Sequence, residues 1–191
     1  MDTTRLYDQL AALFEYPGKD YAERVSRCAA ALAAVQPDAA STLEEFCGQV
    51  RGRTAEELQE HFIQTFDLNP DCSLELGWHL FGENYDRGTY LVKLRGLLRR
   101  FGLAETHELP DHVTYALALL GRMPEAEAEE FAIACVLPAL QKIRAAVKKE
   151  NSFHTLLEVV AALLGSRFAA FPLESIPAAP ALRVLNGSGL A

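Results

Sequence analysis

Apolar side chains recur every three or four positions along most of the chain, which is the spacing that gathers them on one face of an α-helix. The clearest stripe lies between Tyr21 and Val35, where apolar residues follow one another in steps of four, three, four and three. The other segments in which we expect helices are 6–14, 41–50, 54–66, 84–101, 111–120, 124–149 and 152–164. Strands do not alternate with these helices, so the pattern predicts an all-α bundle in a single domain.

Proline and capping residues set the expected ends of these helices. Segments 41–44 (Ser-Thr-Leu-Glu) and 54–57 (Thr-Ala-Glu-Glu) both match a capping box, so each predicts a helix start. Pro110 predicts the first residue of a helix, because the N–H that proline lacks is not needed at that position. Pro138 predicts a kink or a break within a longer helix. The short apolar segment 74–81 fits either a strand or a helix.

The end of the chain has a different pattern. Ser152 is expected to cap the last helix and Gly165 to end it. Three prolines between 172 and 180 forbid a continuous helix beyond that point. We therefore expect a helical domain over residues 1–165, followed by an extended, Pro-containing tail over residues 166–191 that packs on or near it.

Composition and charge narrow the function classes. The chain has 191 residues, and half of them are apolar, which excludes an intrinsically disordered chain. Its net charge of −8 makes it a poor candidate for binding the phosphate backbone of a nucleic acid. An acidic chain suits a cationic partner. No apolar run approaches ~20 residues, and the N-terminus lacks the basic and apolar parts of a secretory signal. We expect a cytoplasmic protein with reduced thiols and no integral membrane association.

The chain carries no recognisable enzyme motif. It lacks a phosphate-binding loop, a dinucleotide-binding glycine motif, a nucleophile elbow and a zinc-protease helix motif. None of the five histidines follows a glutamate by three residues, so the di-iron bundle motif is absent. The four cysteines have no metal-site spacing, and those at 28 and 135 lie on apolar stripes, where we expect them in the core.

Two segments carry more information than composition does. Aromatic residues, including the only tryptophan, crowd a helix–loop–helix corner between residues 62 and 88 beside Glu83, Asp86 and Arg87. The corner fits ordinary core with capping charges, or an apolar groove with an ionic rim, which is a common form of peptide-binding site. The second segment, 108–112, reads Glu-Leu-Pro-Asp-His and has the signature of a helix N-terminus.

An ordered set of short motifs runs through these segments. They are Tyr16-Pro17, Phe66-Asp67, Ser73-Leu74, His79, Gly82-Glu83, Arg87-Gly88 and Glu108-Leu109-Pro110-Asp111-His112. The set resembles the NarJ branch of the NarJ/TorD/DmsD family of redox-enzyme maturation proteins, and the resemblance covers about residues 6–165. It implies a TorD-like helical bundle that is not an enzyme and that binds no cofactor stably.

The resemblance also implies a function. Members of this family bind the N-terminal leader peptide of a molybdoenzyme catalytic subunit, such as nitrate reductase, and hold it while the molybdenum cofactor is inserted. A leader peptide is basic and then apolar, which an acidic chain with an aromatic groove complements. The residues expected to bind the peptide are Phe62, Phe66, Trp78, Phe81, Glu83, Tyr85, Asp86, Arg87, Tyr90, Pro110, Asp111 and His112.

Two other classes of function stay open. The first is a helical-bundle enzyme or metal protein with a site near His79, Glu83, Asp111 and His112. The second is a regulatory adaptor that binds no leader peptide. In each case we expect a monomer, with exchange of helices between protomers as the alternative.

Overall fold

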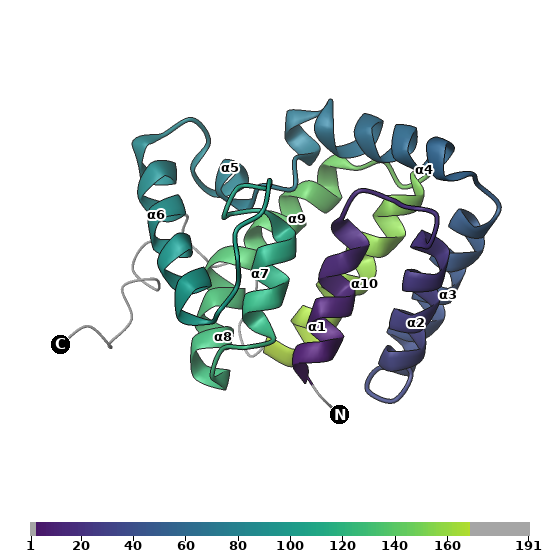
Figure 1. Ribbon diagram of the computed structural model, residues 1–191, viewed down its shortest axis with the longest axis horizontal. Helices are drawn as coiled ribbons and strands as arrows, with labels where there is room; N and C mark the ends of the chain where they lie inside the picture. Colours follow the sequence, from purple (N-terminus) through teal and green to yellow (C-terminus); the bar gives the residue numbers. More distant parts are fainter. Residues whose placement is uncertain (1–2, 169–191) are drawn as a thin grey trace.

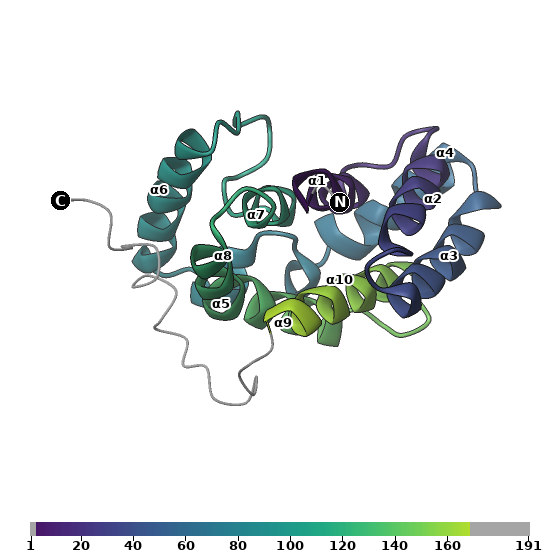
Figure 2. The same ribbon diagram turned by 90° about the horizontal axis from the view of Figure 1, so that it is seen from below.

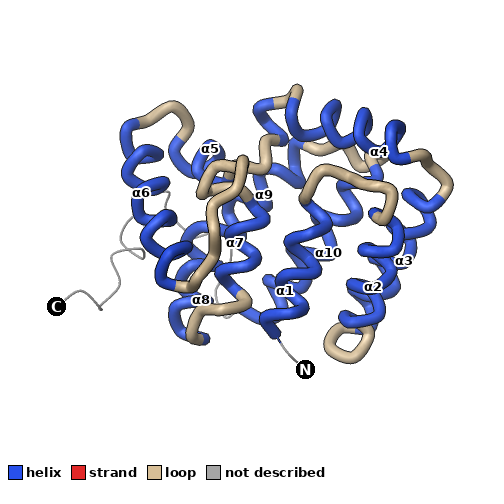
Figure 3. Tube along the Cα trace, in the orientation of Figure 1, coloured by secondary structure: helices blue, strands red, loops and turns tan. Residues whose placement is uncertain are grey.

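Helices form almost all of the secondary structure (Figures 1 and 3). The computed structural model describes residues 3–168. No strand occurs among them, and their only sheet-like pairing is an isolated antiparallel bridge between Glu75 and His112. The prediction of an all-α fold is confirmed. The α-helices are α1 (Thr3–Ala11), α2 (Tyr21–Leu32), α3 (Pro37–Arg51), α4 (Ala55–Phe62), α5 (Leu76–Phe81), α6 (Tyr85–Arg100), α7 (Val113–Leu120), α8 (Glu125–Phe131), α9 (Leu137–Ala146) and α10 (Ser152–Phe168).

Four short helical turns connect or extend these helices. Two are 3-10 turns, η1 (Ala12–Phe14) and η3 (Pro70–Cys72). The other two are π-helical, η2 (Ile63–Asp67) and η4 (Ala132–Val136). A π-turn adds a residue to the helical path and redirects the side chains after it.

Helices from both ends of the described chain interlock. The first helix, α1, packs against α7 and α2, and the last described helix, α10, packs against α3 and α9 (Figure 2). The Thr4 hydroxyl donates to the Gly121 carbonyl oxygen at 2.7 Å, and Arg122 forms a two-pronged ion pair with Asp8 at 2.6 and 2.9 Å. Contacts of this kind hold together segments more than 110 residues apart.

An aromatic cluster within the core surrounds Phe153 at the start of α10. Its side chain is fully buried, and its ring lies 5.8 Å from Phe46, 5.6 Å from Phe62 and 5.2 Å from Phe66, centre to centre. His61 stacks on the same ring at 5.1 Å. Aromatic rings at these separations attract one another in addition to burying apolar area. This cluster joins α10 to α3 and to the end of α4.

Three helix starts test the predicted caps. Thr54 and Glu57 form the full capping box expected for α4. The box predicted at Ser41 is wrong, because α3 already begins at Pro37 and Ser41 lies inside it. The predicted start at Pro110 is also wrong, since α7 begins at Val113 and the chain before it pairs with the segment preceding α5.

The later boundaries follow the same physical rules with small shifts. Pro138 lies in the first turn of α9, directly after η4, so the helical path is interrupted where proline predicts it. Asn151, rather than Ser152, caps α10 by accepting the Phe153 amide at 2.9 Å. The predicted end at Gly165 is wrong, because α10 continues to the buried Phe168. The predicted tail beyond it, residues 169–191, lies outside the described residues.

Two further observations concern the described residues. All four cysteines are free and buried, which confirms the core position predicted for Cys28 and Cys135. Burial raises the pKa of both thiols to about 12, so neither is an activated nucleophile. None of the described helices is both long enough and apolar enough to cross a membrane.

Candidate functional site

A cavity of about 490 Å³ opens where four stretches of the chain meet. The stretches are the end of η1 with the loop after it, the α4–η2 helix, the 70–87 segment with α5, and the loop before α7. The residues that line the cavity are Phe14, Tyr16, Phe62, Phe66, Asp67, Pro70, Ser73, Leu74, Glu75, Trp78, Arg87, Glu108, Leu109 and His112.

Aromatic rings form one side of this cavity. Phe62 and Phe66 are nearly fully buried and lie 5.0 Å apart, and the half-exposed Tyr16 meets Phe62 edge-on at 6.0 Å. The π-turn η2 produces this arrangement, since the Leu68 amide bonds to the Ile63 carbonyl five residues earlier, at 3.0 Å. The wider turn directs Phe66 and the following Asp67 to the same cavity.

A short backbone pairing forms another wall of the cavity. The Leu76 amide donates to the Asp111 carbonyl oxygen at 2.8 Å, and the Val113 amide donates to the Leu74 carbonyl oxygen at 2.9 Å. These two bonds place Glu75 and His112 side by side at the cavity. Segments 74–76 and 111–113 are thereby locked together although about 35 residues separate them in sequence.

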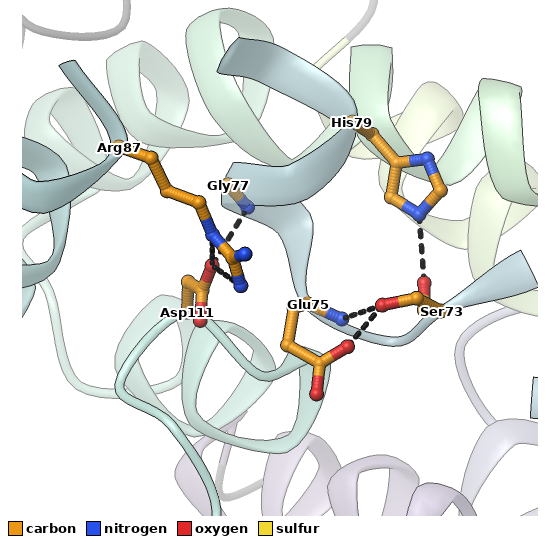
Figure 4. Close-up of polar contacts among 6 residues, drawn as sticks. All are labelled: Ser73, Glu75, Gly77, His79, Arg87 and Asp111. Carbon is orange, nitrogen blue, oxygen red and sulfur yellow. Dashed lines mark hydrogen bonds and ion pairs between the residues drawn. The ribbon is translucent and has the colours of Figure 1, made fainter. Parts of the chain in front are cut away.

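Asp111 lies behind this wall and joins it to α5 and α6 (Figure 4). Its side chain is 0% exposed. One oxygen, Oδ2, accepts the Gly77 amide at 3.1 Å and both Nε and Nη2 of Arg87 at 3.3 Å. The other oxygen has no partner among the described residues. Burial raises the pKa of Asp111, and the guanidinium of Arg87 opposes that shift.

Arg87 connects Asp111 to the cavity. Its guanidinium carbon lies 5.7 Å from the centre of the Trp78 ring, within the range of a cation–π contact. The arginine side chain is 22% exposed, whereas its partner carboxylate is fully buried. Arg87 therefore presents a stacked and already neutralised cation to the cavity.

Three carboxylates give the cavity its charge. We call Asp67, Glu75 and Glu108 the acidic triad. Burial raises the pKa of Asp67, and the negative charges of Glu108 and Glu75 raise it further. Within the described residues, none of the three forms an ion pair with an arginine or lysine, and Glu108 meets only the exposed His107 imidazole, at 3.4 Å. Among the residues that the structure describes, the negative charges of the triad are therefore not balanced by a paired arginine or lysine.

Two histidines support the wall. Burial lowers the pKa of His112 and of His79, which favours the neutral imidazole in both. His112 contacts the Thr114 hydroxyl through Nδ1 at 2.9 Å and caps α7. His79 lies 2.7 Å from the Ser73 carbonyl oxygen through Nε2, and Ser73 also hydrogen-bonds the Glu75 carboxylate (Figure 4).

The structure brings together part of the predicted peptide-binding set. Five of its members line the cavity, namely Phe62, Phe66, Trp78, Arg87 and His112. Pro110, Asp111 and Tyr90 are buried and do not line it, so Asp111, although it belongs to the predicted set, does not offer its carboxylate at the surface of the cavity. Phe81 packs on Tyr90 at 5.3 Å, while Glu83, Tyr85 and Asp86 are exposed outside the cavity.

Several lining residues were missing from the predicted set. Phe14, Tyr16 and the acidic triad are the most important of them, because they supply an aromatic edge and most of the charge. The sequence carried a signal for most of these residues. Tyr16, Asp67 and Glu108 all stand within the ordered motifs, and Glu75 follows one of them directly.

The alternative metal site is not assembled. Over residues 3–168, no group of three or more His, Cys, Asp or Glu side chains lies close enough to hold a metal ion. His79, Glu83, Asp111 and His112 therefore form no such group. His79 is engaged with Ser73 and Asp111 with Arg87, while Glu83 is exposed.

Fold and site together define an all-α protein with an aromatic, acidic cavity. A family model described as "Nitrate reductase delta subunit" matches residues 29–166, and the chain belongs to this family. The predicted resemblance to the NarJ type is thereby confirmed. Relatives named "Nitrate reductase molybdenum cofactor assembly chaperone NarJ", from Escherichia coli strain K12 and from E. coli O157:H7, are each 31% identical to it over 102 residues. The match spans 53% of this chain and 43% of each relative's length.

Proposed function

We propose that this protein is an assembly chaperone for a molybdoenzyme of the nitrate reductase type. In this role it binds the N-terminal leader peptide of the catalytic subunit in the cytoplasm and holds it until the molybdenum cofactor is inserted. It catalyses no reaction and retains no cofactor of its own. Family membership and the names of the two relatives support this role.

The observation that carries the proposal is the chemistry of the cavity. Its aromatic side fits the apolar part of a leader peptide, and its acidic triad fits the basic part. Exposed charge pairs contribute only ~0.2–1 kcal/mol each, so burial of apolar side chains supplies most of the affinity. Charge then selects which apolar peptides bind.

The predicted residues outside the cavity have a place in this proposal. A cavity of about 490 Å³ holds a ligand the size of a few side chains, so a leader peptide extends beyond it. Glu83 lies in the α5–α6 connection and Tyr85 and Asp86 in the first turn of α6, all shortly after Trp78 in the chain, and Tyr85 is 88% exposed. We place the continuation of the peptide over this connection.

Calorimetric titration tests the proposal. The ligands are synthetic N-terminal peptides of the molybdoenzyme subunits encoded in the same genome as this chain. We expect one peptide to bind at micromolar affinity or better, with a negative heat-capacity change from apolar burial. The control is the same peptide with its apolar residues replaced by serine. If the folded protein binds none of the peptides, the proposal is wrong and a regulatory adaptor becomes the better reading.

A further inference from the structure

We propose that Asp111 is a specificity-determining residue that never touches the peptide: it neutralises Arg87 from behind the wall and so leaves the acidic triad free to select a basic segment. This inference rests on the proposed function and deepens it. It assigns Asp111 a positioning role, and it names the peptide class as one whose basic and apolar residues are adjacent.

The charge balance of the cavity is the first step. Arg87 is the only arginine or lysine among the described residues that line it, opposite three carboxylates. A guanidinium released into this space would pair with the triad and compete with a cation of the peptide. Glu75 is one candidate partner, because it lines the cavity with Arg87 and its negative charge acts on Asp111, the present partner of Arg87.

The position of Asp111 is the second step. Its carboxylate is sealed between the Gly77 amide and the Arg87 guanidinium, so a bound peptide cannot reach it. The fit is tight, since a Cβ added at Gly77 would lie 2.5 Å from Oδ2. Two backbone bonds from segment 74–76 fix the main chain around Asp111. The carboxylate can therefore hold Arg87 only where it now lies.

The orientation of Arg87 is the third step. Asp111 receives the Nε and Nη2 donors, and the guanidinium stays close to the Trp78 ring. Arginine held in this way widens the apolar wall and does not add a free positive charge. The arrangement explains why a cavity meant for a basic ligand contains an arginine.

Quenching of tryptophan fluorescence by ions tests the charge of the cavity without a peptide. Trp78 is the only tryptophan and lines the cavity, so its fluorescence reports quenchers that enter it. With each quenching constant divided by that of free N-acetyltryptophanamide, we expect a caesium-to-iodide ratio above one in the wild type, because the triad attracts cations and repels anions. Asp111→Asn should lower the caesium-to-iodide ratio, and the double variant Asp111→Asn/Arg87→Gln should restore it. Asp38→Asn removes the same charge from an exposed site on α3 and should leave the ratio unchanged.

Peptide titration tests selectivity with the same variants. The probes are the leader peptide that binds the wild type and an analogue with each lysine and arginine replaced by glutamine. We expect Asp111→Asn to weaken binding of the basic peptide by about three- to fivefold, the effect of one charge pair, and to leave the analogue unchanged. The double variant should return the affinity for the basic peptide to within about twofold of the wild type.

The outcomes separate this proposal from a purely structural role. If Asp111 only ties segment 109–113 to α5, then Asp111→Asn weakens both peptides alike and removing Arg87 restores neither, which would overturn the proposal. Should Asp111→Asn fail to fold, Arg87→Gln alone provides the test. It leaves the charge of Asp111 uncompensated, so it must raise the preference for the basic peptide over the analogue and raise the quenching ratio. If the folded wild type binds no peptide, the proposed function fails, while the quenching ratio still tests the charge balance.

Discussion

Replacement of Gly77 by alanine tests whether the close approach of α5 to Asp111 holds the cavity wall in place. Gly77 is the second residue of α5 and is buried. An added Cβ would lie 2.5 Å from Asp111 Oδ2 and 3.0 Å from Tyr90 Cδ1. Asp111 has a short side chain, and its main chain is fixed by the pairing with segment 74–76, so it cannot move aside without breaking bonds.

The expected magnitude follows from opposing effects. Alanine in place of glycine stabilises a helix by roughly 0.5–1 kcal/mol, with less gain in the first turn. Overpacking costs about 1–3 kcal/mol, and loss of the hydrogen bond between the Gly77 amide and the carboxylate costs about 1.5–3 kcal/mol. We expect Gly77→Ala to lower the free energy of unfolding by about 2–4 kcal/mol.

A matched control lies in α6. Gly96 is exposed, has ordinary helical geometry, and nothing lies within 4 Å of an added Cβ. Gly96→Ala should therefore raise the free energy of unfolding by about 0.5–1 kcal/mol. Urea denaturation followed by circular dichroism measures both variants, and Trp78 fluorescence reports the state of the wall in the same samples.

The comparison has a clear refuting result. If Gly77→Ala gains stability as Gly96→Ala does, the Asp111 carboxylate has room to move and the wall is not held as described. If Gly77→Ala is destabilised but keeps the wild-type fluorescence of Trp78, the strain is released somewhere other than in the wall.

The remaining predictions address binding, capping and pH. Trp78→Ala should weaken peptide binding by more than about tenfold, as loss of a central aromatic contact does. Val92→Ala, on the exposed face of α6, should leave the affinity unchanged. Equal effects of the two variants in calorimetric titration would contradict this prediction. Thr54→Ala should lower the free energy of unfolding by about 1 kcal/mol in urea denaturation, because it removes the capping box of α4; an unchanged midpoint contradicts it. Burial lowers the pKa of His79 from its ordinary 6.5, so the unfolded chain binds the proton first as the pH falls. The neutral, buried imidazole of His79 therefore stabilises the fold above pH 6.5, and this stabilisation is lost as the pH falls below that value. Between about pH 7.5 and 5.5, the free energy of unfolding should fall less in His79→Gln than in the wild type. An equal fall in both proteins would contradict the lowered pKa.

Local signals in the sequence predicted most of the helices. The stripe that begins at Tyr21 and the capping box at Thr54 are satisfied within a few residues of chain, so the sequence specifies them without reference to the rest of the fold. The start of α7 shows the limit of such reasoning. Proline at the first helical position is a sound local rule, but residues 111–113 pair with residues 74–76, and that tertiary pairing delays the helix to Val113.

The site was predictable where an ordered motif or the aromatic corner between residues 62 and 88 marked it. Trp78, Phe66 and His112 stand in segments that the ordered motifs identified, and all three line the cavity. The burial of Asp111 could not be read from its neighbours, because an aspartate at a helix start is usually exposed. Its partners, Gly77 and Arg87, lie 34 and 24 residues earlier in the chain.

The place of Phe153 has a consequence for the order of events during translation. The residues that line the cavity lie between positions 14 and 112, yet two of its buried rings, Phe62 and Phe66, both pack on Phe153 in α10. A nascent chain that has not yet emerged past residue 153 contains every residue that lines the cavity, but it lacks the Phe153 ring on which Phe62 and Phe66 pack. Synthesis must therefore proceed past residue 153 before Phe62 and Phe66 gain the ring that supports them, and a shorter nascent chain presents the lining of the cavity without that support.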